Sequence, residues 1–330
     1  TSTVAGASQF VLNLEAAVPL LPPHQGTLSV VDLGCAHGKQ SISVIKQLFD
    51  ELKTQSNYIQ NLNQLNVYHE DLPDNDFKAV EKSINDPEIG YLTHDLVKQN
   101  NIKVNYNFIG KSFYEEILPN SSLDLAFCYN SLHFLPEYKS TKFGIAYTPE
   151  YGDEELTKWF NDTANGYFAK FLTSRYYELK AGGLLSINIP TESNFQNWVN
   201  SNWKKVFEAR GLNYRDFDKV VFPVYYRPLE QVNKVLSEFN EKFKLIRSFT
   251  VSNQSMVNPN VTEVQKQNMK NHFKAVIYNQ IVSGLEHYPD TFKDEEARDK
   301  LYSELEDLCF NDPSPRENKS SFEWLVLQKI

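Results

Sequence analysis

Cysteine is scarce in this sequence, and patterns typical of metal-binding sites are missing. The three cysteines, Cys35, Cys128 and Cys309, are odd in number and far apart along the chain. Neither a C-x-x-C nor an H-x-x-x-H pattern occurs. We therefore expect no disulfide framework and no metal site.

Long apolar runs and blocks of basic residues are also absent. No run approaches the roughly 20 apolar residues that a transmembrane helix needs, and no signal-peptide pattern is visible. Lys and Arg number 33 against 42 Asp and Glu, which gives a formal net charge of −9. These features predict a cytoplasmic protein that binds neither nucleic acid nor a membrane.

What the sequence does contain is an alternation of apolar strands and amphipathic helices. Its 330 residues, 41% of them hydrophobic, suffice for one large α/β domain with insertions. The pattern predicts a Rossmann-like doubly wound sheet. It also predicts a long helix over residues 153–180, which Gly182 and Gly183 would close.

Two stretches depart from this alternation and are expected to be mainly helical. They comprise residues 190–228 and 254–319, and we interpret them as a cap inserted over the sheet. The remaining residues, 1–189, 229–253 and 320–330, would form the α/β core.

The first predicted strand ends in the segment Asp32-Leu33-Gly34-Cys35-Ala36-His37-Gly38. Glycines without a Cβ let the backbone approach a ligand closely, and a helix follows directly. The spacing G-x-x-x-G lacks the third glycine of the dinucleotide pattern G-x-G-x-x-G. It therefore disfavours an NAD-dependent oxidoreductase and favours an adenosine ligand without phosphates, with S-adenosylmethionine (SAM) as the first candidate.

Other polar residues follow later strands at the same predicted edge. Asp71 ends the second strand, where a doubly wound sheet places its ribose-binding carboxylate. Ser112 and Phe113 follow the third strand, in a turn suited to an adenine edge and face. The sequence leaves two interpretations of His133, a core histidine or a ligand-facing one. Gln9 also has two interpretations, a solvated polar residue and a functional one, and the sequence alone favours the solvated residue.

Taken together and in order, several segments resemble the SABATH family of SAM-dependent carboxyl methyltransferases. The matching segments are Asp32-Leu33-Gly34-Cys35 with Gly38, Asp71-Leu72-Pro73-x-Asn75-Asp76-Phe77, Ser112-Phe113-Tyr114, Ser131-Leu132-His133-x-Leu135, Arg175-x-x-Glu178-Leu179 and Phe222-Pro223-Val224-Tyr225. The resemblance implies a class I SAM methyltransferase fold and a homodimer.

The resemblance also implies roles for individual residues. Two acids would hold the amino-acid end and the ribose of SAM, and further residues would line its path, the full set being Asp32, Gly34, Gly38, Asp71, Leu72, Ser112, Phe113, Cys128 and Asn130. The acceptor would meet a second set, namely Gln9, His133, Phe134, Trp198, Tyr225 and Tyr226. Phe134 stands where the family has a tryptophan that donates to the substrate carboxylate, and we expect His133 to supply that donor.

The implied reaction methylates the carboxylate of a small acid and yields a methyl ester and S-adenosylhomocysteine (SAH). A carboxylate is already ionised at pH 7 and needs no general base, so Gln9 and His133 would be positioning residues. One alternative is an N- or phenolic O-methyltransferase of the same fold that uses His133 as a base. A second alternative is a SAM-binding protein without catalysis.

Overall fold

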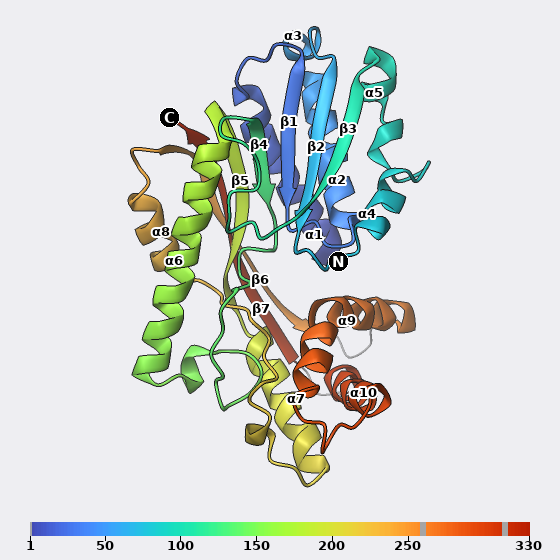
Figure 1. Cartoon of the computed structure of the whole chain (residues 1–330), viewed down its shortest axis with the longest axis vertical. Helices are drawn as coiled ribbons and strands as arrows, with labels where there is room; N and C mark the ends of the chain where they lie inside the picture. Colours follow the sequence, from blue (N-terminus) through green and yellow to red (C-terminus); the bar gives the residue numbers. More distant parts are fainter. Residues whose placement is uncertain (1, 258–261, 312–315) are drawn as a thin grey trace.

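The computed structural model describes residues 2–257, 262–311 and 316–330, in which seven strands form one sheet flanked by helices (Figure 1). The order across the sheet is β3-β2-β1-β4-β5-β7-β6. The first five strands are mutually parallel, and β7 is antiparallel to both of its neighbours. The strands are β1 (Thr27–Leu33), β2 (Gln64–Asp71), β3 (Lys103–Gly110), β4 (Leu123–Cys128), β5 (Leu179–Ser193), β6 (Phe243–Val257) and β7 (Arg316–Lys329).

Side-chain alternation along the strands divides the core into two layers. On β1, Val30 belongs to one buried cluster and Val31 to another, because successive side chains of a strand point to opposite faces. Helices that cover the first face are α1 (Ser2–Ala17), α2 (Lys39–Thr54), α4 (Phe77–Ile84) and α5 (Asp95–Asn100). The second face is covered by α6 (Glu154–Glu178) and α8 (Leu229–Ser237). The predicted Rossmann-like sheet is therefore confirmed.

A separate hydrophobic cluster lies at the end of the sheet toward which β1 to β4 point (Figure 1). It is built from α7 (Phe195–Ala209), α9 (Glu263–Leu285) and α10 (Glu295–Asn311). Strands β5, β6 and β7 extend into this region. The sequence placed the cap at residues 190–228 and 254–319, but β5 continues to Ser193, β6 continues to Val257, and β7 already begins at Arg316. The remaining short elements are α3 (Ser56–Ile59) and the 3-10 helices η1 (Val18–Leu20), η2 (Tyr91–Thr93), η3 (Pro149–Tyr151) and η4 (Tyr214–Asp216).

The prediction for the end of the long helix is wrong. Helix α6 stops at Glu178, and β5 begins at the next residue. The pairing of β4 with β5 then shifts register, so that Leu123 faces Leu179 whereas Leu125 faces Leu184. Gly182, with φ of +74°, serves this bulge within the strand rather than a helix end.

The order of strands reverses between β1 and β4, which is where open α/β sheets typically bind their ligands. From β1 the chain proceeds outward to β2 and β3, and then returns to the other side of β1 with β4 and β5. In sheets of this kind the connecting loops typically diverge at such a reversal, next to the carboxyl ends of the strands. No helix within the described residues is long and apolar enough to cross a membrane.

Candidate functional site

The turn after β1 requires its first glycine. Gly34 has φ of +81°, a backbone conformation that residues with a Cβ rarely adopt. A Cβ built there would lie 2.3 Å from Oγ of Ser131 and 3.7 Å from Cε1 of Phe113. The loops that follow β1, β3 and β4 therefore converge on Gly34, at the carboxyl ends of these strands.

The second glycine of the motif begins the next helix. Gly38 has φ of +87°, donates its N–H to the carbonyl of Cys35 at 3.0 Å, and immediately precedes α2. A Cβ at this position would lie 3.1 Å from Val80 on α4. Both glycines thus hold a tight turn against neighbouring segments, as the sequence pattern indicates.

Asp71 ends β2 with its carboxylate tied to the same turn. One oxygen accepts a hydrogen bond from the N–H of Ala36 at 2.7 Å, and the other accepts one from the N–H of Leu72 at 2.8 Å. A carboxylate has about four acceptor positions, so roughly two remain for a ligand. The side chain of Leu72 is 53% exposed next to it and offers an apolar surface. This pair suits a ribose with an attached base.

Three carboxyl groups come together at this edge, and their environment disfavours negative charge. Burial, and to a lesser extent the neighbouring Asp71, raises the pKa of Asp32 to about 7, although a hydrogen bond from Ser41 opposes the shift. Burial and Asp71 also raise the pKa of Glu70 to about 9, although the N–H of Gly34 donates to Glu70 at 3.0 Å. A cationic ligand would favour the ionised carboxylates here, whereas a pyrophosphate would be repelled. The cationic sulfonium of SAM fits this edge.

The loop after β3 presents an aromatic ring to the turn. Phe113 is half-buried, 4.7 Å from the ring of Tyr114 and 6.0 Å from that of Phe171 on α6. Ser112 lies beside it and accepts a hydrogen bond from the N–H of Tyr114 at 3.3 Å. The two residues predicted to meet an adenine therefore lie on one loop next to Gly34.

The two predicted cofactor residues at the end of β4 differ in exposure. Asn130 is exposed, has φ of +60°, and is held through two hydrogen bonds by Asn188 of β5. Cys128 is fully buried in the core beneath α6, and burial raises the pKa of its thiol. A cofactor contact from Cys128 would have to involve its backbone.

Three of the predicted acceptor residues lie together. The ring of His133 is 4.5 Å from that of Phe134 and 5.6 Å from that of Tyr226. Tyr225 points elsewhere, since its hydroxyl contacts Gln231 at 3.2 Å and its ring stacks on Phe160 of α6. Of the two tyrosines left open by the sequence, Tyr226 is the one whose ring lies beside that of His133, whereas Tyr225 contacts His133 through its backbone N–H, which donates to the carbonyl of His133 at 2.8 Å.

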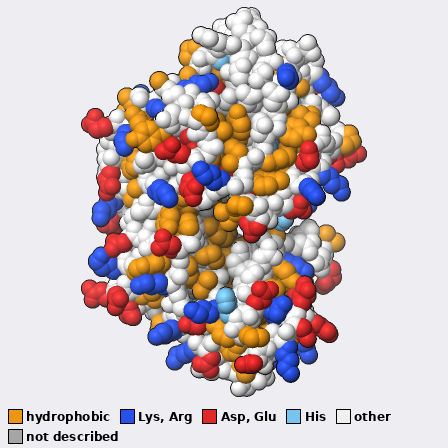
Figure 2. Space-filling model, in the orientation of Figure 1, with side chains coloured by type: hydrophobic (Ala, Val, Ile, Leu, Met, Phe, Trp, Pro, Cys, Tyr) orange, Lys and Arg blue, Asp and Glu red, His pale blue; other side chains and the backbone are white. Residues whose placement is uncertain are grey.

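Trp198 joins this group through a row of aromatic rings. The centroid of Phe222 lies 6.1 Å from that of Phe134 and 6.1 Å from that of Phe195, and Phe195 is 5.6 Å from Trp198. The row connects the loop after β4 with α7. Figure 2 shows hydrophobic side chains gathered over the middle of the face, between the strand ends and the helices α7, α9 and α10. Gln9 lies in α1, but its side chain is outside the part that the structure describes.

The sequence did not predict the buried arginine that lies next to His133. Arg227 is fully buried and donates to the carbonyls of Leu132 at 2.7 Å and Ala164 at 3.0 Å. Burial, followed by the charge of Arg227, lowers the pKa of His133 to about 3. Nδ1 of His133 is buried without a hydrogen-bond partner among the described residues. His133 is therefore a neutral group with one unpaired ring nitrogen at pH 7.

Comparisons with known proteins identify the family of this chain. A family model described as SAM-dependent carboxyl methyltransferase matches residues 8–328. "Methyltransferase FUS9" of Gibberella fujikuroi is 25% identical over 262 residues, which is 73% of this chain and 68% of that protein. "Probable 7-methylxanthine methyltransferase PCS2" of Camellia ptilophylla is 26% identical over 337 residues, 92% of this chain and 85% of that one.

A solved structure of loganic acid methyltransferase with SAH has the same fold. It aligns with a TM-score of 0.70 at 18% identity, and the alignment covers 98% of this chain and 92% of the other. This match confirms the class I SAM methyltransferase fold, and the family model confirms the family resemblance. Since the family model spans nearly the whole chain, the protein belongs to the SAM-dependent carboxyl methyltransferases.

Proposed function

We propose that this protein transfers the methyl group of SAM to the carboxylate of a small-molecule acid, giving a methyl ester and SAH. The observation that carries the proposal is the edge formed by Gly34, Asp32 and Asp71, which provides acids and a tight turn where SAM requires them. Family membership supports the same reaction.

The cofactor would lie across the ends of β1, β2 and β3. Asp32 and the turn from Gly34 to Gly38 would take the amino-acid end of SAM, and Asp71 would accept from the ribose hydroxyls. Leu72 and Phe113 would flank the adenine and Ser112 would contact its edge, with Cys128 and Asn130 nearby.

The acceptor would bind beyond the sulfonium, on the loop after β4. His133 supports this placement because its Nδ1 is buried and unpaired. The acceptor pocket would also include Gln9, Phe134, Trp198 and one or both of Tyr225 and Tyr226. The helical cap of residues 190–228 and 254–319 would close over it.

No proton needs to leave the acceptor for this reaction. The carboxylate oxygen forms a bond to the methyl carbon of SAM while the carbon–sulfur bond breaks and its electron pair stays on sulfur. The chain's contribution is alignment of the oxygen, carbon and sulfur away from water, which supplies roughly 7–11 kcal/mol in favourable cases. A histidine with a pKa of about 3 suits a positioning role, because such a weak base gives little driving force for removing a proton.

A second candidate is methylation of a ring nitrogen. It is favoured by the similarity to "Probable 7-methylxanthine methyltransferase PCS2", which extends over 92% of this chain. A ring N–H has to lose its proton, so this reaction would use His133 as the base. A SAM-binding protein without catalysis would show no transfer to either class of acceptor.

The two reactions give products with different chemical stability. Methyl-labelled SAM is incubated with a panel of small carboxylic acids and, separately, of xanthines. A methyl ester releases labelled methanol in mild alkali, whereas an N-methyl or aryl ether group does not. We expect alkali-labile label with one or more acids, and alkali-stable label with the xanthines alone would refute the proposal.

Two further properties belong to the proposal. We place the protein in the cytoplasm on the basis of its composition, and we infer a homodimer from the family resemblance. Sedimentation of the purified protein would measure the second.

A further inference from the structure

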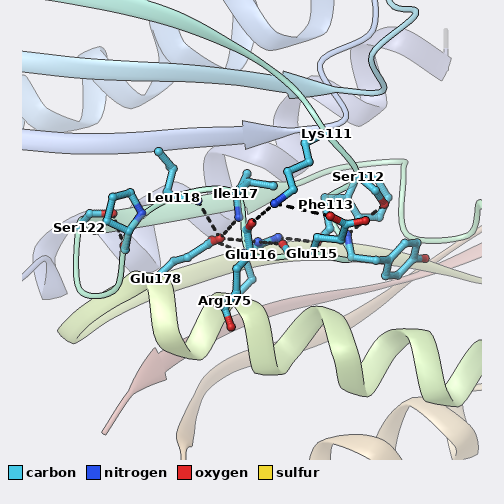
Figure 3. A network of polar contacts seen from close by, with 12 residues as sticks. Lys111, Ser112, Phe113, Glu115, Glu116, Ile117, Leu118, Ser122, Arg175 and Glu178 are labelled. Carbon is cyan, nitrogen blue, oxygen red and sulfur yellow. Dashed lines mark hydrogen bonds and ion pairs between the residues drawn. The ribbon is translucent and has the colours of Figure 1, made fainter.

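A buried ion pair on α6 lies against the loop that carries Ser112 and Phe113 (Figure 3). Arg175 and Glu178 are both fully buried. Nε of Arg175 is 2.8 Å from Oε2 of Glu178, and a second guanidinium nitrogen is 3.0 Å from Oε1. This bidentate ion pair fixes the relative orientation of both side chains.

The other hydrogen bonds of the pair go to backbone groups of the same loop. Arg175 donates to the carbonyl of Phe113 at 2.7 Å and to that of Glu115 at 2.8 Å. Oε1 of Glu178 accepts from the N–H of Ile117 at 2.5 Å and from that of Leu118 at 3.1 Å. The pair thus binds two carbonyls and two N–H groups on either side of Glu116.

The attraction between the two charges does not by itself explain why both are buried at this position. A buried ion pair is expensive to desolvate, and its replacement by apolar residues of similar volume is often neutral or stabilising. What the pair does provide is a rigid fork that binds four backbone groups in fixed directions. The loop it fixes begins at the residue proposed to contact the adenine edge.

We propose that Arg175 and Glu178 are positioning residues that set the preference of the cofactor site for adenine. They hold the loop of residues 112–118 so that the polar groups beside Phe113 match the amino-substituted edge of that base. This inference rests on the proposed role of Ser112 and Phe113. It predicts that weakening the pair reduces discrimination between bases more than it reduces general affinity for the ligand.

The test compares SAH with S-inosylhomocysteine, in which hypoxanthine replaces adenine. Calorimetry measures both affinities for the unaltered protein and for the Glu178→Gln and Arg175→Lys variants. We expect each variant to lose about tenfold in affinity for SAH, the equivalent of about one hydrogen bond between neutral groups. Affinity for S-inosylhomocysteine should change less than about twofold, because hypoxanthine lacks the amino-substituted edge that the loop is proposed to match.

An exposed pair on the same helix provides the control. Lys158 and Asp162 form an ion pair at the surface of α6, and Asp162→Asn should leave both affinities unchanged. If the single variants unfold, the double variant Arg175→Met with Glu178→Leu restores an apolar filling. It should fold, although it should melt below the unaltered protein because four backbone groups of the loop lose their partners, and it should still lose its preference for SAH.

Two results would overturn the inference. An equal loss for both ligands, or no loss in the folded double variant, would reduce the pair to a structural role and leave the cofactor site intact. Failure of the unaltered protein to bind SAH at all would instead contradict the proposed function on which the inference depends.

Discussion

Replacement of Asp71 gives the most informative single perturbation of the cofactor site. Its two carboxylate oxygens each accept one backbone hydrogen bond, from Ala36 at 2.7 Å and from Leu72 at 2.8 Å. That leaves about two acceptor positions for the two ribose hydroxyls of SAM. A hydrogen bond to a charged group contributes about 1.5–3 kcal/mol, so the two together contribute about 3–6 kcal/mol.

The Asp71→Ala variant loses both ribose contacts. At about 1.4 kcal/mol for each factor of ten, we expect its affinity for SAH to fall by about a hundredfold to ten-thousandfold. Asp71→Asn keeps one acceptor oxygen but brings an amide NH2 toward a backbone N–H. Its affinity for SAH should lie between those of the unaltered protein and Asp71→Ala. Titration calorimetry with SAH measures all three affinities.

Asp74 provides a matched control in the same loop. It is exposed and raises the pKa of Asp71 through its charge. Asp74→Asn therefore removes one negative charge from the site without removing a ribose acceptor, and its SAH affinity should stay within about threefold of the unaltered value. A folded Asp71→Ala protein that binds SAH as tightly as this control would refute the reasoning.

Three further predictions concern other parts of the site. Because the pKa of the unliganded Asp32 is raised to about 7, a proton has to leave before the carboxylate can bind cationic SAM; SAM affinity should therefore rise between about pH 6 and 8, and Asp32→Asn should remove this dependence in calorimetry. Gly34→Ala should lower stability by about 2 kcal/mol or more in denaturant unfolding, because its Cβ would meet Ser131, whereas Gly211→Ala, with φ of +69° and open space around it, should lose less. His133→Ala should raise the KM for the acceptor by about tenfold with little change in kcat, and a steep loss of kcat at saturating acceptor would indicate a general base instead.

The sequence predicted the parts of the site that depend on local pattern. The glycine turn at Gly34 and the acid at Asp71 follow predicted strands, and parallel strands end at one edge of the sheet. Their convergence could be inferred from topology. The contact of Gly34 with Ser131, nearly a hundred residues away, could not, because no local spacing records it.

The features that could not be predicted from the sequence all depend on contacts between distant segments. Arg227 is buried by α6 and by the loop after β4, and a lone arginine before a proline carries no signal of this. Gly182 and Gly183 follow a helical pattern, and only the register of β4 with β5 turns them into a strand bulge. Likewise, nothing in the local sequence distinguishes Glu70 from other strand residues. Only the pairing of β1 with β2 brings its carboxyl group to the N–H of Gly34.

A crystal structure of the protein with SAH would test the proposed cofactor site most directly. We predict the ribose hydroxyls on the carboxylate of Asp71, the adenine between Leu72 and Phe113, and the sulfur directed toward His133. The proposed site would be contradicted if aromatic side chains fill the ends of β1 and β2 and exclude SAH, or if SAH binds elsewhere on the molecule.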